Sequence, residues 1–379
     1  MGPSMVRLLH LADVHLGASM SPFGDAAEVR RRRLLDAFRG LPEIARREEV
    51  HAVLVAGDLF DRPEPESEVR AAVAETFARL AADGRPVFVV PGNHDSSTLL
   101  RHPYSEPLGG ARVFLAPVFE RHSVETPGGP LHVYGLAYDM GREDAPLSTF
   151  ARANLPGVHV VLLHGSADFS PHWRIGRNAL RLPLDALAGL ECDYVALGDY
   201  HGFRPPERFG GEPHPPACYS GSFAALDLTE TGPRGWVIAD VEGGRPPRVS
   251  HRPSPVPALV DLGDVDVGAA PDHDEVMRRI AERAHADSHP VVRLVGVPDF
   301  ALDPDFLIHR LTERYGFARL TDASTFYASA RLDRVAEDDT VAGHMVRLAR
   351  GRIGAEPDDG EKAIAERALR IALRALEVS

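Results

Sequence analysis

Cysteine, lysine and long apolar segments are scarce in this sequence of 379 residues. Cys192 and Cys218 are its two cysteines, which excludes a disulfide framework and a four-thiolate zinc site and favours a reducing, cytoplasmic setting. Lys362 is the single lysine, which we interpret as codon bias rather than chemistry. No apolar run approaches the roughly 20 residues that a membrane span needs. The N-terminus lacks the pattern of a secretory signal, so we expect neither membrane insertion nor secretion.

Charge and length set further limits. The net charge of -13 excludes a uniformly basic surface for nucleic acid, although a local basic patch remains open. Hydrophobic residues make up 44% and charged residues 26%, as in an ordinary folded protein. At roughly 150 residues per domain, the length predicts two to three domains. The 55 acidic residues and 18 histidines include enough oxygen and imidazole groups for divalent metal sites.

Short apolar runs alternate with helical patterns over the first two-thirds of the chain. Buried strands are predicted by β-branched-rich runs at 6–11, 52–56, 87–90, 159–163 and 194–197, with later ones at 217–219 and 236–241. Apolar residues at helical spacing predict helices over 28–47 and 69–82. Strands that alternate with helices indicate an α/β sheet domain.

The rest of the chain predicts smaller units. Residues 243–257 hold five prolines and two adjacent glycines, which indicates a linker. The next stretch predicts strands at 260–262 and 291–295 and helices at 274–285 and 305–315, followed by tail helices at 341–350 and 361–378. We therefore expect a main domain over 5–242, a linker over 243–257, a small α/β domain over 258–335 and a helical tail over 336–379.

Polar clusters follow five of the predicted strands. The carboxyl ends of strands in an open α/β sheet form the edge where ligands bind. Seven side chains in these clusters are candidate metal ligands: Asp13, His15, Asp58, Asn93, His164, Asp199 and His201. Carboxylate, amide and imidazole donors without thiolate suit manganese, iron, magnesium or zinc rather than a structural zinc cage. Seven ligands fill two ions if one carboxylate bridges, and such a pair can hold a phosphate and activate a water.

Each cluster alone has a simpler interpretation. An Asp-x-His or Gly-Asp sequence after a strand is frequently a turn or a cap. His164 alone fits a hydrogen-bonded core histidine, and His201 alone fits a surface residue. The joint occurrence of all five clusters in this order favours the metal site.

This order of motifs resembles the calcineurin-like metallophosphoesterase superfamily and, more narrowly, the SbcD-type DNA repair exonucleases. The resemblance rests on Leu-Ala-Asp-Val-His-Leu-Gly at 11–17, Gly-Asp-Leu-Phe-Asp at 57–61 and Tyr-Ser-Gly-Ser at 219–222, followed by Gly-Pro-Arg-Gly at 232–235. It covers 5–241 well, is looser over 258–335 and is loosest over the tail. It implies a two-sheet sandwich flanked by helices, a small α/β capping domain and a helical C-terminal tail.

The resemblance also implies roles for the candidate ligands. One metal is expected on Asp13, His15, Asp58 and His201, and the other on Asp58, Asn93, His164 and Asp199, with Asp58 as the bridge. His94 is expected beside the phosphate as the catalytic residue, where it stabilises the transition state and helps the leaving oxygen to depart. Asp95 is expected to orient that histidine or its loop.

The sequence departs from the family pattern at two positions. Asp199 stands where the family has a histidine. The extra carboxylate lowers the charge of two divalent ions and their ligands and favours harder ions, so we expect two Mn(II) ions, with Mg, Fe or Zn as alternatives. Asp61 stands where archaeal and eukaryotic relatives tend to have histidine, and we expect a structural role in its loop.

Nucleic-acid and protein contacts are expected at two further places. The run Arg30, Arg31, Arg32 and Arg33 is either a solvated helix face or a phosphate-binding patch, and Arg174 and Arg177 are weaker candidates. The apolar stripe over 361–378 is either core or, as the resemblance implies, a binding site for an SbcC-type coiled-coil ATPase. Relatives also dimerise through helices of the nuclease domain, so a homodimer is expected as well.

The function that we predict is two-metal phosphodiester hydrolysis of DNA, by an exonuclease or endonuclease of repair or recombination. One alternative is a phosphoesterase for small phosphodiesters or phosphoproteins. The others are a scaffold that has lost its metals and a regulatory DNA-binding subunit. The segment 258–335 favours DNA, and competent residues at all seven ligand positions oppose the loss of metal.

Overall fold

The computed structural model describes residues 5–142, 144–168, 179–210, 214–298, 300, 302–324, 329–356 and 358–376. The chain forms two compact units, Met1–Leu259 and Val260–Ser379, and each is described by itself. Within the described ranges, no helix combines the length and the apolar composition needed to cross a membrane.

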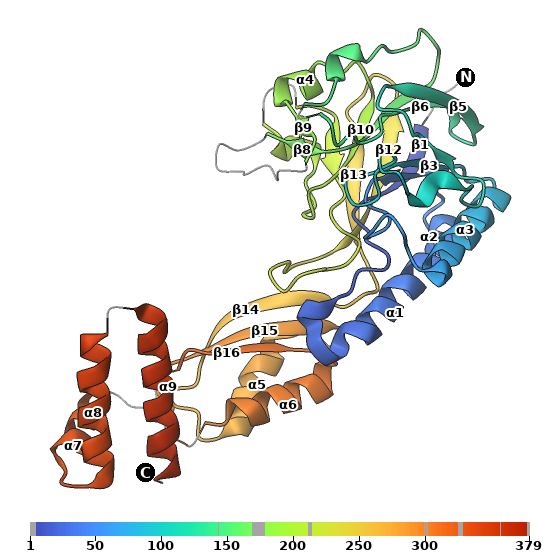
Figure 1. The fold of residues 1–379 in the computed structure, drawn as a ribbon. Coiled ribbons are helices and arrows are strands. Elements are labelled where there is room, and N and C mark those ends of the chain that lie inside the picture. Colours follow the sequence, from blue (N-terminus) through green and yellow to red (C-terminus); the bar gives the residue numbers. More distant parts are fainter. Residues whose placement is uncertain are drawn as a thin grey trace. The chain divides into compact units, whose positions relative to one another are not determined.

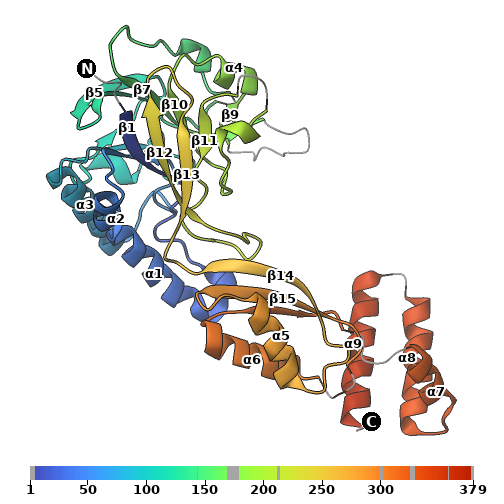
Figure 2. The same cartoon turned by 180° about the vertical axis from the view of Figure 1, so that it is seen from behind.

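Two sheets form the first unit (Figures 1 and 2). The six-stranded sheet has the order β13 (Arg248–Pro253), β12 (Gly235–Glu242), β1 (Met5–Leu11), β2 (Ala52–Ala56), β3 (Val87–Val90) and β4 (Arg112–Val113). The five-stranded sheet has the order β11 (Ala217–Tyr219), β10 (Tyr194–Gly198), β7 (Val158–His164), β6 (Gly129–Gly135) and β5 (Glu120–Thr126). The strands β1 to β4 are parallel, as are β6, β7, β10 and β11. Their carboxyl ends therefore meet at shared edges.

The core between the sheets follows from strand periodicity. On β7, Val158, Val160 and Leu162 belong to the core shared by the two sheets, whereas Val161 and Leu163 pack on the outer face of the five-stranded sheet. That outer face is covered by α4 (Leu184–Ala188), the short strands β8 (Ser166–Ala167) and β9 (Arg181–Leu182), and the short 3-10 helix η3 (Leu147–Thr149). Phe209, which follows the 3-10 helix η4 (Pro206–Arg208), packs there as well. This arrangement confirms the predicted two-sheet sandwich.

The helices α1 (Ala27–Arg39), α2 (Leu41–Arg47) and α3 (Ser67–Ala82) flank the six-stranded sheet (Figure 2). Two further 3-10 helices, η1 (Ser21–Ala26) and η2 (Pro103–Ser105), lie in connecting loops. One helix was predicted over 28–47, but the structure breaks it at Gly40. Pro42 has no amide hydrogen for a helical bond and therefore fits the first turn of a new helix.

The structure also differs from the prediction around the sheet edges. The hairpin β5–β6 was not predicted, because its outer strand alternates exposed with half-buried residues and has no continuous apolar run. Strand β13 lies inside the predicted linker and pairs with β12. It ends at Pro253 on the edge of the sheet, where a proline does not interrupt a central ladder.

The second unit contains a small α/β layer and a group of helices. Its sheet has the order β14 (Ala258–Asp266), β15 (Ser288–Val295) and β16 (Arg319–Asp322), and α5 (His273–Arg283) and α6 (Pro304–Tyr315) share a hydrophobic core with it. Separately, α7 (Ser329–Glu337), α8 (Val341–Ala355) and α9 (Asp359–Ala375) pack around Val346 and Leu373. Helix α7 crosses residue 335, where the sequence predicted the end of the small domain.

Candidate metal centre

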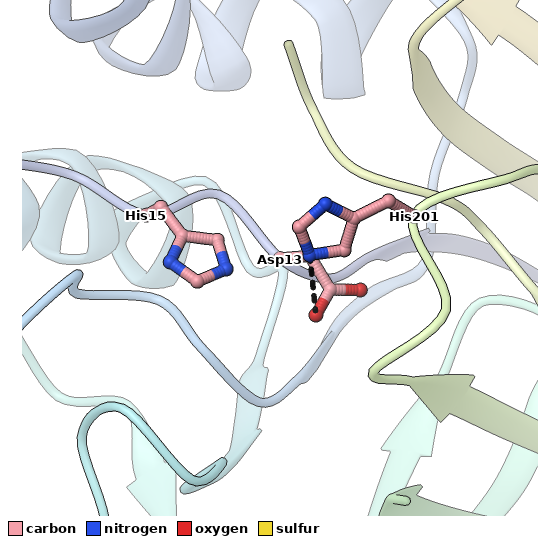
Figure 3. Close-up of side chains that lie close together, drawn as sticks. All are labelled: Asp13, His15 and His201. Atoms are coloured by element: carbon pink, nitrogen blue, oxygen red, sulfur yellow. Dashed lines mark ion pairs between the residues drawn. The ribbon is translucent and has the colours of Figure 1, made fainter. Parts of the chain in front are cut away.

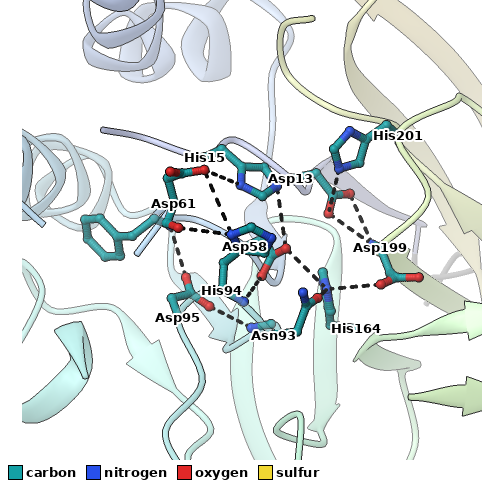
Figure 4. Close-up of polar contacts among 12 residues, drawn as sticks. Asp13, His15, Asp58, Asp61, Asn93, His94, Asp95, His164, Asp199 and His201 are labelled. Carbon is teal, nitrogen blue, oxygen red and sulfur yellow. Dashed lines mark hydrogen bonds and ion pairs between the residues drawn. The ribbon is translucent and has the colours of Figure 1, made fainter. Parts of the chain in front are cut away.

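The seven predicted ligands and His94 come together at the carboxyl edges of the two sheets (Figure 4). Asp13 and His15 follow β1, and Asp58 follows β2. The remaining positions follow strands β3, β7 and β10 or end one of them: Asn93, His94, His164, Asp199 and His201. Residues that lie up to 188 positions apart in the sequence thus share one site, as Asp13 and His201 do.

Backbone strain is concentrated at this site. Asp13, His15, Asp58 and Asp199 have positive φ angles of 49°, 48°, 49° and 95°. Such angles are uncommon in residues other than glycine and cost about 1–3 kcal/mol each, so they persist mainly where the surroundings or the function require them. Four of the seven predicted ligands therefore have backbones shaped for side-chain placement rather than for stability.

Asp58 occupies the centre of the site. Its Oδ2 lies 3.5 Å from His15 Nε2 and 3.6 Å from His164 Nε2, while its Oδ1 accepts a hydrogen bond from the His94 amide at 2.9 Å. Gly92 allows this approach, since a Cβ there would lie 2.2 Å from Asp58 Oδ1. The carboxylate therefore stands between two imidazoles, as a bridging ligand must.

Two groups of possible donors consist of predicted ligands alone, and a third group joins His15 and Asp58 to His94. In the first, Asp13, His15 and His201 offer ligand atoms within 4.8 Å of one another (Figure 3). In the second, Asp13, Asp58 and His164 do the same. His164 Nε2 also lies 2.9 Å from Asn93 Oδ1 and 3.8 Å from Asp199 Oδ1. Both groups consist of oxygen and imidazole nitrogen, the donors that suit hard or borderline divalent ions.

The three ligand histidines share one arrangement. In each, Nδ1 lies within hydrogen-bonding distance of an oxygen acceptor: Asp61 Oδ1 at 3.1 Å for His15, the Ala56 carbonyl at 2.9 Å for His164 and Glu230 Oε1 at 2.5 Å for His201. These oxygens accept, so they favour the tautomer with hydrogen on Nδ1. In His15 and His201, Nε2 is then left with its lone pair for a metal. His164 differs, because its Nε2 faces a second acceptor, Asn93 Oδ1, at 2.9 Å.

Burial and charge show that the residues fit a cation. His15 Nε2 is buried and has no hydrogen-bond partner among the described residues, so an ion would satisfy an otherwise orphaned atom. Burial alone would lower the pKa of His164, but Asp58, Asp13 and Asp199 raise it to about 9. Burial also opposes the charge on His201, yet Glu230 and Asp13 raise its pKa to about 9. The carboxylates thus create a strong local preference for positive charge.

His94 lies at the exposed side of this site. Its side chain is 44% exposed, and its ring stands edge-on to His15 with centroids 4.6 Å apart. His94 Nδ1 lies 3.0 Å from the carbonyl oxygen of Asp61, which can only accept, so Nδ1 carries a hydrogen. Nε2 is therefore the nitrogen through which this ring can act on a bound group.

Two neighbouring aspartates organise the loops. Asp95 is fully buried and accepts hydrogen bonds from the Gly92 and Phe60 amides and from the Tyr104 hydroxyl, so of its two expected roles it fixes the loop. Asp61, expected to be structural, contacts His15 through its carboxylate and His94 through its carbonyl.

Sequence reasoning did not find Glu230 at all. Its position, eight residues after Ser222 in a turn-rich segment, gives no metal-ligand spacing.

The arginine run does not form one surface. Arg30 is 1% exposed, and its guanidinium donates to the Pro257 and Ala225 carbonyls and lies over the Phe23 ring. The prediction that Arg30 binds DNA is therefore wrong, because its place on α1 faces the interior. Arg31 pairs with Glu28 and Glu66. Arg32 also pairs with Glu28, at 3.7 Å, but is 74% exposed, and Arg33 is exposed. A DNA contact at Arg31, Arg32 and Arg33 stays a prediction, and Arg174 and Arg177 lie outside the described residues.

Comparisons with known proteins agree with this geometry. The family model for the calcineurin-like phosphoesterases matches residues 6–203, just over half of the chain. The chain is similar to the uncharacterized metallophosphoesterase YhaO of Bacillus subtilis, with 28% identity over 63% of this chain and 58% of that protein. It is similar to the DNA double-strand break repair protein Mre11 of Aeropyrum pernix, with 30% identity over 69% of this chain and 64% of that protein. It is also similar to the SbcD component of the nuclease SbcCD of Rhodobacter capsulatus, with 29% identity over 67% of this chain and 71% of that protein. The chain thus spans less than two-thirds of the first two relatives.

Proposed function

This chain belongs to the calcineurin-like phosphoesterase family, and on that premise we propose that it is a nuclease that hydrolyses phosphodiester bonds of DNA with two divalent metal ions. The observation that carries the proposal is the convergence of seven competent ligands around Asp58. The names of two relatives, a double-strand break repair protein and a nuclease component, support DNA as the substrate.

The proposed ligand sets divide at Asp58. Asp13, His15, Asp58 and His201 would hold one ion, and Asp58, Asn93, His164 and Asp199 the other. When bound, two such ions would coordinate the phosphate oxygens and lower the pKa of the attacking water. Two divalent ions carry +4 and the three ligand aspartates about -3, so the site keeps about +1, and this balance supports a hard ion such as Mn(II).

His94 is the residue that we assign to the reacting phosphate. The Asp61 carbonyl and the edge of the His15 ring hold its imidazole from one side. With the Nδ1 hydrogen held by the carbonyl, a ring that also carries a proton on Nε2 can donate from Nε2 to a phosphate oxygen, or pass that proton to the departing sugar oxygen and return to the neutral imidazole. Because the ring is partly exposed, it can reach a polymer that approaches from solvent.

A protein partner is proposed for the C-terminal helices. Val341 and Leu348 on α8 and Ile364 and Ile371 on α9 are each more than 60% exposed, although both helices bury other apolar residues against one another. Exposed apolar side chains of this kind mark interaction surfaces when they cluster. We assign this surface to a coiled-coil ATPase of the SbcC type, since one relative is named as a component of the SbcCD nuclease. Self-association through helices of the first unit is proposed as well.

The substrate is tested by comparing two phosphodiesters. We expect Mn²⁺ to support degradation of linear duplex DNA and hydrolysis of bis(p-nitrophenyl) phosphate, and EDTA to abolish both. Asp58→Asn should lose both activities while its circular dichroism stays unchanged. Hydrolysis of the small diester without any degradation of DNA, in the presence and absence of the ATPase partner, would contradict the nuclease proposal and favour a small-substrate phosphoesterase.

A further inference from the structure

The segment between β11 and β12 returns to the candidate metal centre, where it contacts the proposed ligand His201. Glu230 lies in this segment, with its side chain 16% exposed. Its Oε1 lies 2.5 Å from His201 Nδ1, and its Oε2 accepts a hydrogen bond from the Leu226 amide at 2.9 Å. Both oxygens of this carboxylate are therefore committed, one to a ligand ring and one to its own loop.

We propose that Glu230 is a positioning residue that fixes the ring orientation and the tautomer of His201 for metal binding. The inference deepens the proposed function, because it gives His201 its role in the first metal site. A carboxylate at Nδ1 keeps the hydrogen there and directs the Nε2 lone pair to the side where Asp13 Oδ1 lies 4.0 Å away. The negative charge on Glu230 also makes Nε2 a stronger electron-pair donor.

The same loop fixes the backbone of His201. The Arg234 guanidinium donates to the carbonyl oxygen of His201 and to that of Thr231. His201 is consequently held at its ring by Glu230 and at its carbonyl by Arg234.

The variant Glu230→Gln separates this role from simple loop packing. The amide offers one oxygen and one NH₂ group in the shape of the carboxylate. If the oxygen keeps the Leu226 amide, the NH₂ group meets His201 and favours hydrogen on Nε2, which blocks the lone pair. If the oxygen instead faces His201, the Leu226 amide meets a donor and the loop loses its bond. Either arrangement weakens the metal site without removing side-chain volume.

The test measures Mn²⁺ binding by titration calorimetry, without DNA. Loss of a hydrogen-bond partner of a ligand histidine typically lowers metal affinity 10- to 100-fold. We expect Glu230→Gln to lower the affinity for one of the two Mn²⁺ ions by that factor. The matched control is Asp227→Asn in the same loop, where Asp227 accepts bonds from the Thr229 amide and hydroxyl. This control should bind Mn²⁺ like the wild type.

A double-mutant cycle excludes a purely structural effect. If Glu230 acts through His201, Glu230→Gln should cause no further loss of Mn²⁺ affinity in a His201→Ala background. Unchanged affinity in Glu230→Gln, an equal loss in Asp227→Asn or the same loss in both backgrounds would each overturn the inference. Normal Mn²⁺ binding in Glu230→Gln together with DNA cleavage refutes only the role of Glu230. Two bound ions without DNA cleavage in the wild type refute only the nuclease proposal.

Discussion

The substitution Asp95→Asn should weaken the hydrogen bonds that hold two loops of the candidate metal site in place. Asp95 Oδ1 accepts from the Gly92 amide at 2.7 Å, and Oδ2 accepts from the Phe60 amide at 3.1 Å and from the Tyr104 hydroxyl at 2.5 Å. An asparagine has one oxygen, so its NH₂ group must face either the Gly92 or the Phe60 amide. At least one buried N–H then loses its acceptor and meets a second donor.

The cost follows from these bonds. A buried donor left unpaired costs about 1–3 kcal/mol, and bonds to a charged acceptor are worth about 1.5–3 kcal/mol each, so Asp95→Asn should lower the free energy of unfolding by about 2–3 kcal/mol. Tyr104→Phe is the control, because it removes one bond to the same carboxylate but leaves both amides paired, so it should cost less than Asp95→Asn.

Urea unfolding should be followed by far-UV circular dichroism at pH 8 without metal. Burial, together with the charge of Asp58, raises the pKa of Asp95 to about 6, so its carboxyl is ionised at that pH. A raised pKa means that this ionised carboxyl opposes folding, which offsets part of the contribution of its bonds, so the loss in Asp95→Asn should grow as the pH falls from 8 toward 6. A loss below about 0.5 kcal/mol, the size of an ordinary surface substitution, would refute the reasoning.

The remaining predictions concern three residues. His94→Ala should keep two Mn²⁺ ions by calorimetry and lower kcat on DNA by roughly 10²–10⁴-fold, and loss of an ion would contradict its assigned role. Asp199→Ala should bind about one ion instead of two, whereas Asp199→His should bind two and shift preference toward borderline ions; unchanged stoichiometry in Asp199→Ala would exclude Asp199 as a ligand. His10 is buried between the sheets, and burial lowers its pKa to about 3. Below pH 6.5 this histidine binds a proton in the unfolded chain but stays neutral in the folded one. The free energy of unfolding should therefore fall by about 1.4 kcal/mol for each unit by which the pH drops from 6.5 to 3, and this pH dependence should be absent in His10→Gln.

The convergence of the candidate metal ligands was predictable where these residues follow buried strands. The apolar runs before Asp13, Asp58, Asn93, His164 and Asp199 each form a parallel strand, and parallel strands bring their carboxyl ends to one edge. Local sequence therefore carried the information. The broken helix at Gly40 was missed because apolar periodicity continues through the break, although Pro42 marks a helix start.

Contacts that depend on tertiary structure were not predictable. Arg30 and Arg32 share one run of arginines, yet α1 places the first in the interior and the second in solvent. Glu230 lies 29 residues after His201, in a segment without apolar periodicity, and only the folded chain brings the two together. The strained φ angles at Asp13 and Asp58 likewise leave no mark in composition.

The most direct test of the account is the number of Mn²⁺ ions that the wild type and Asp58→Asn bind at saturation, measured by titration calorimetry with a parallel elemental analysis. Asp58 Oδ2 stands between His15 and His164, so its negative charge screens the two ions from each other. Asparagine retains one oxygen but no charge, and the second ion should then be repelled. We predict two ions per chain for the wild type and at most one for Asp58→Asn. One ion in the wild type, or two in the variant, would contradict a two-metal centre bridged by Asp58.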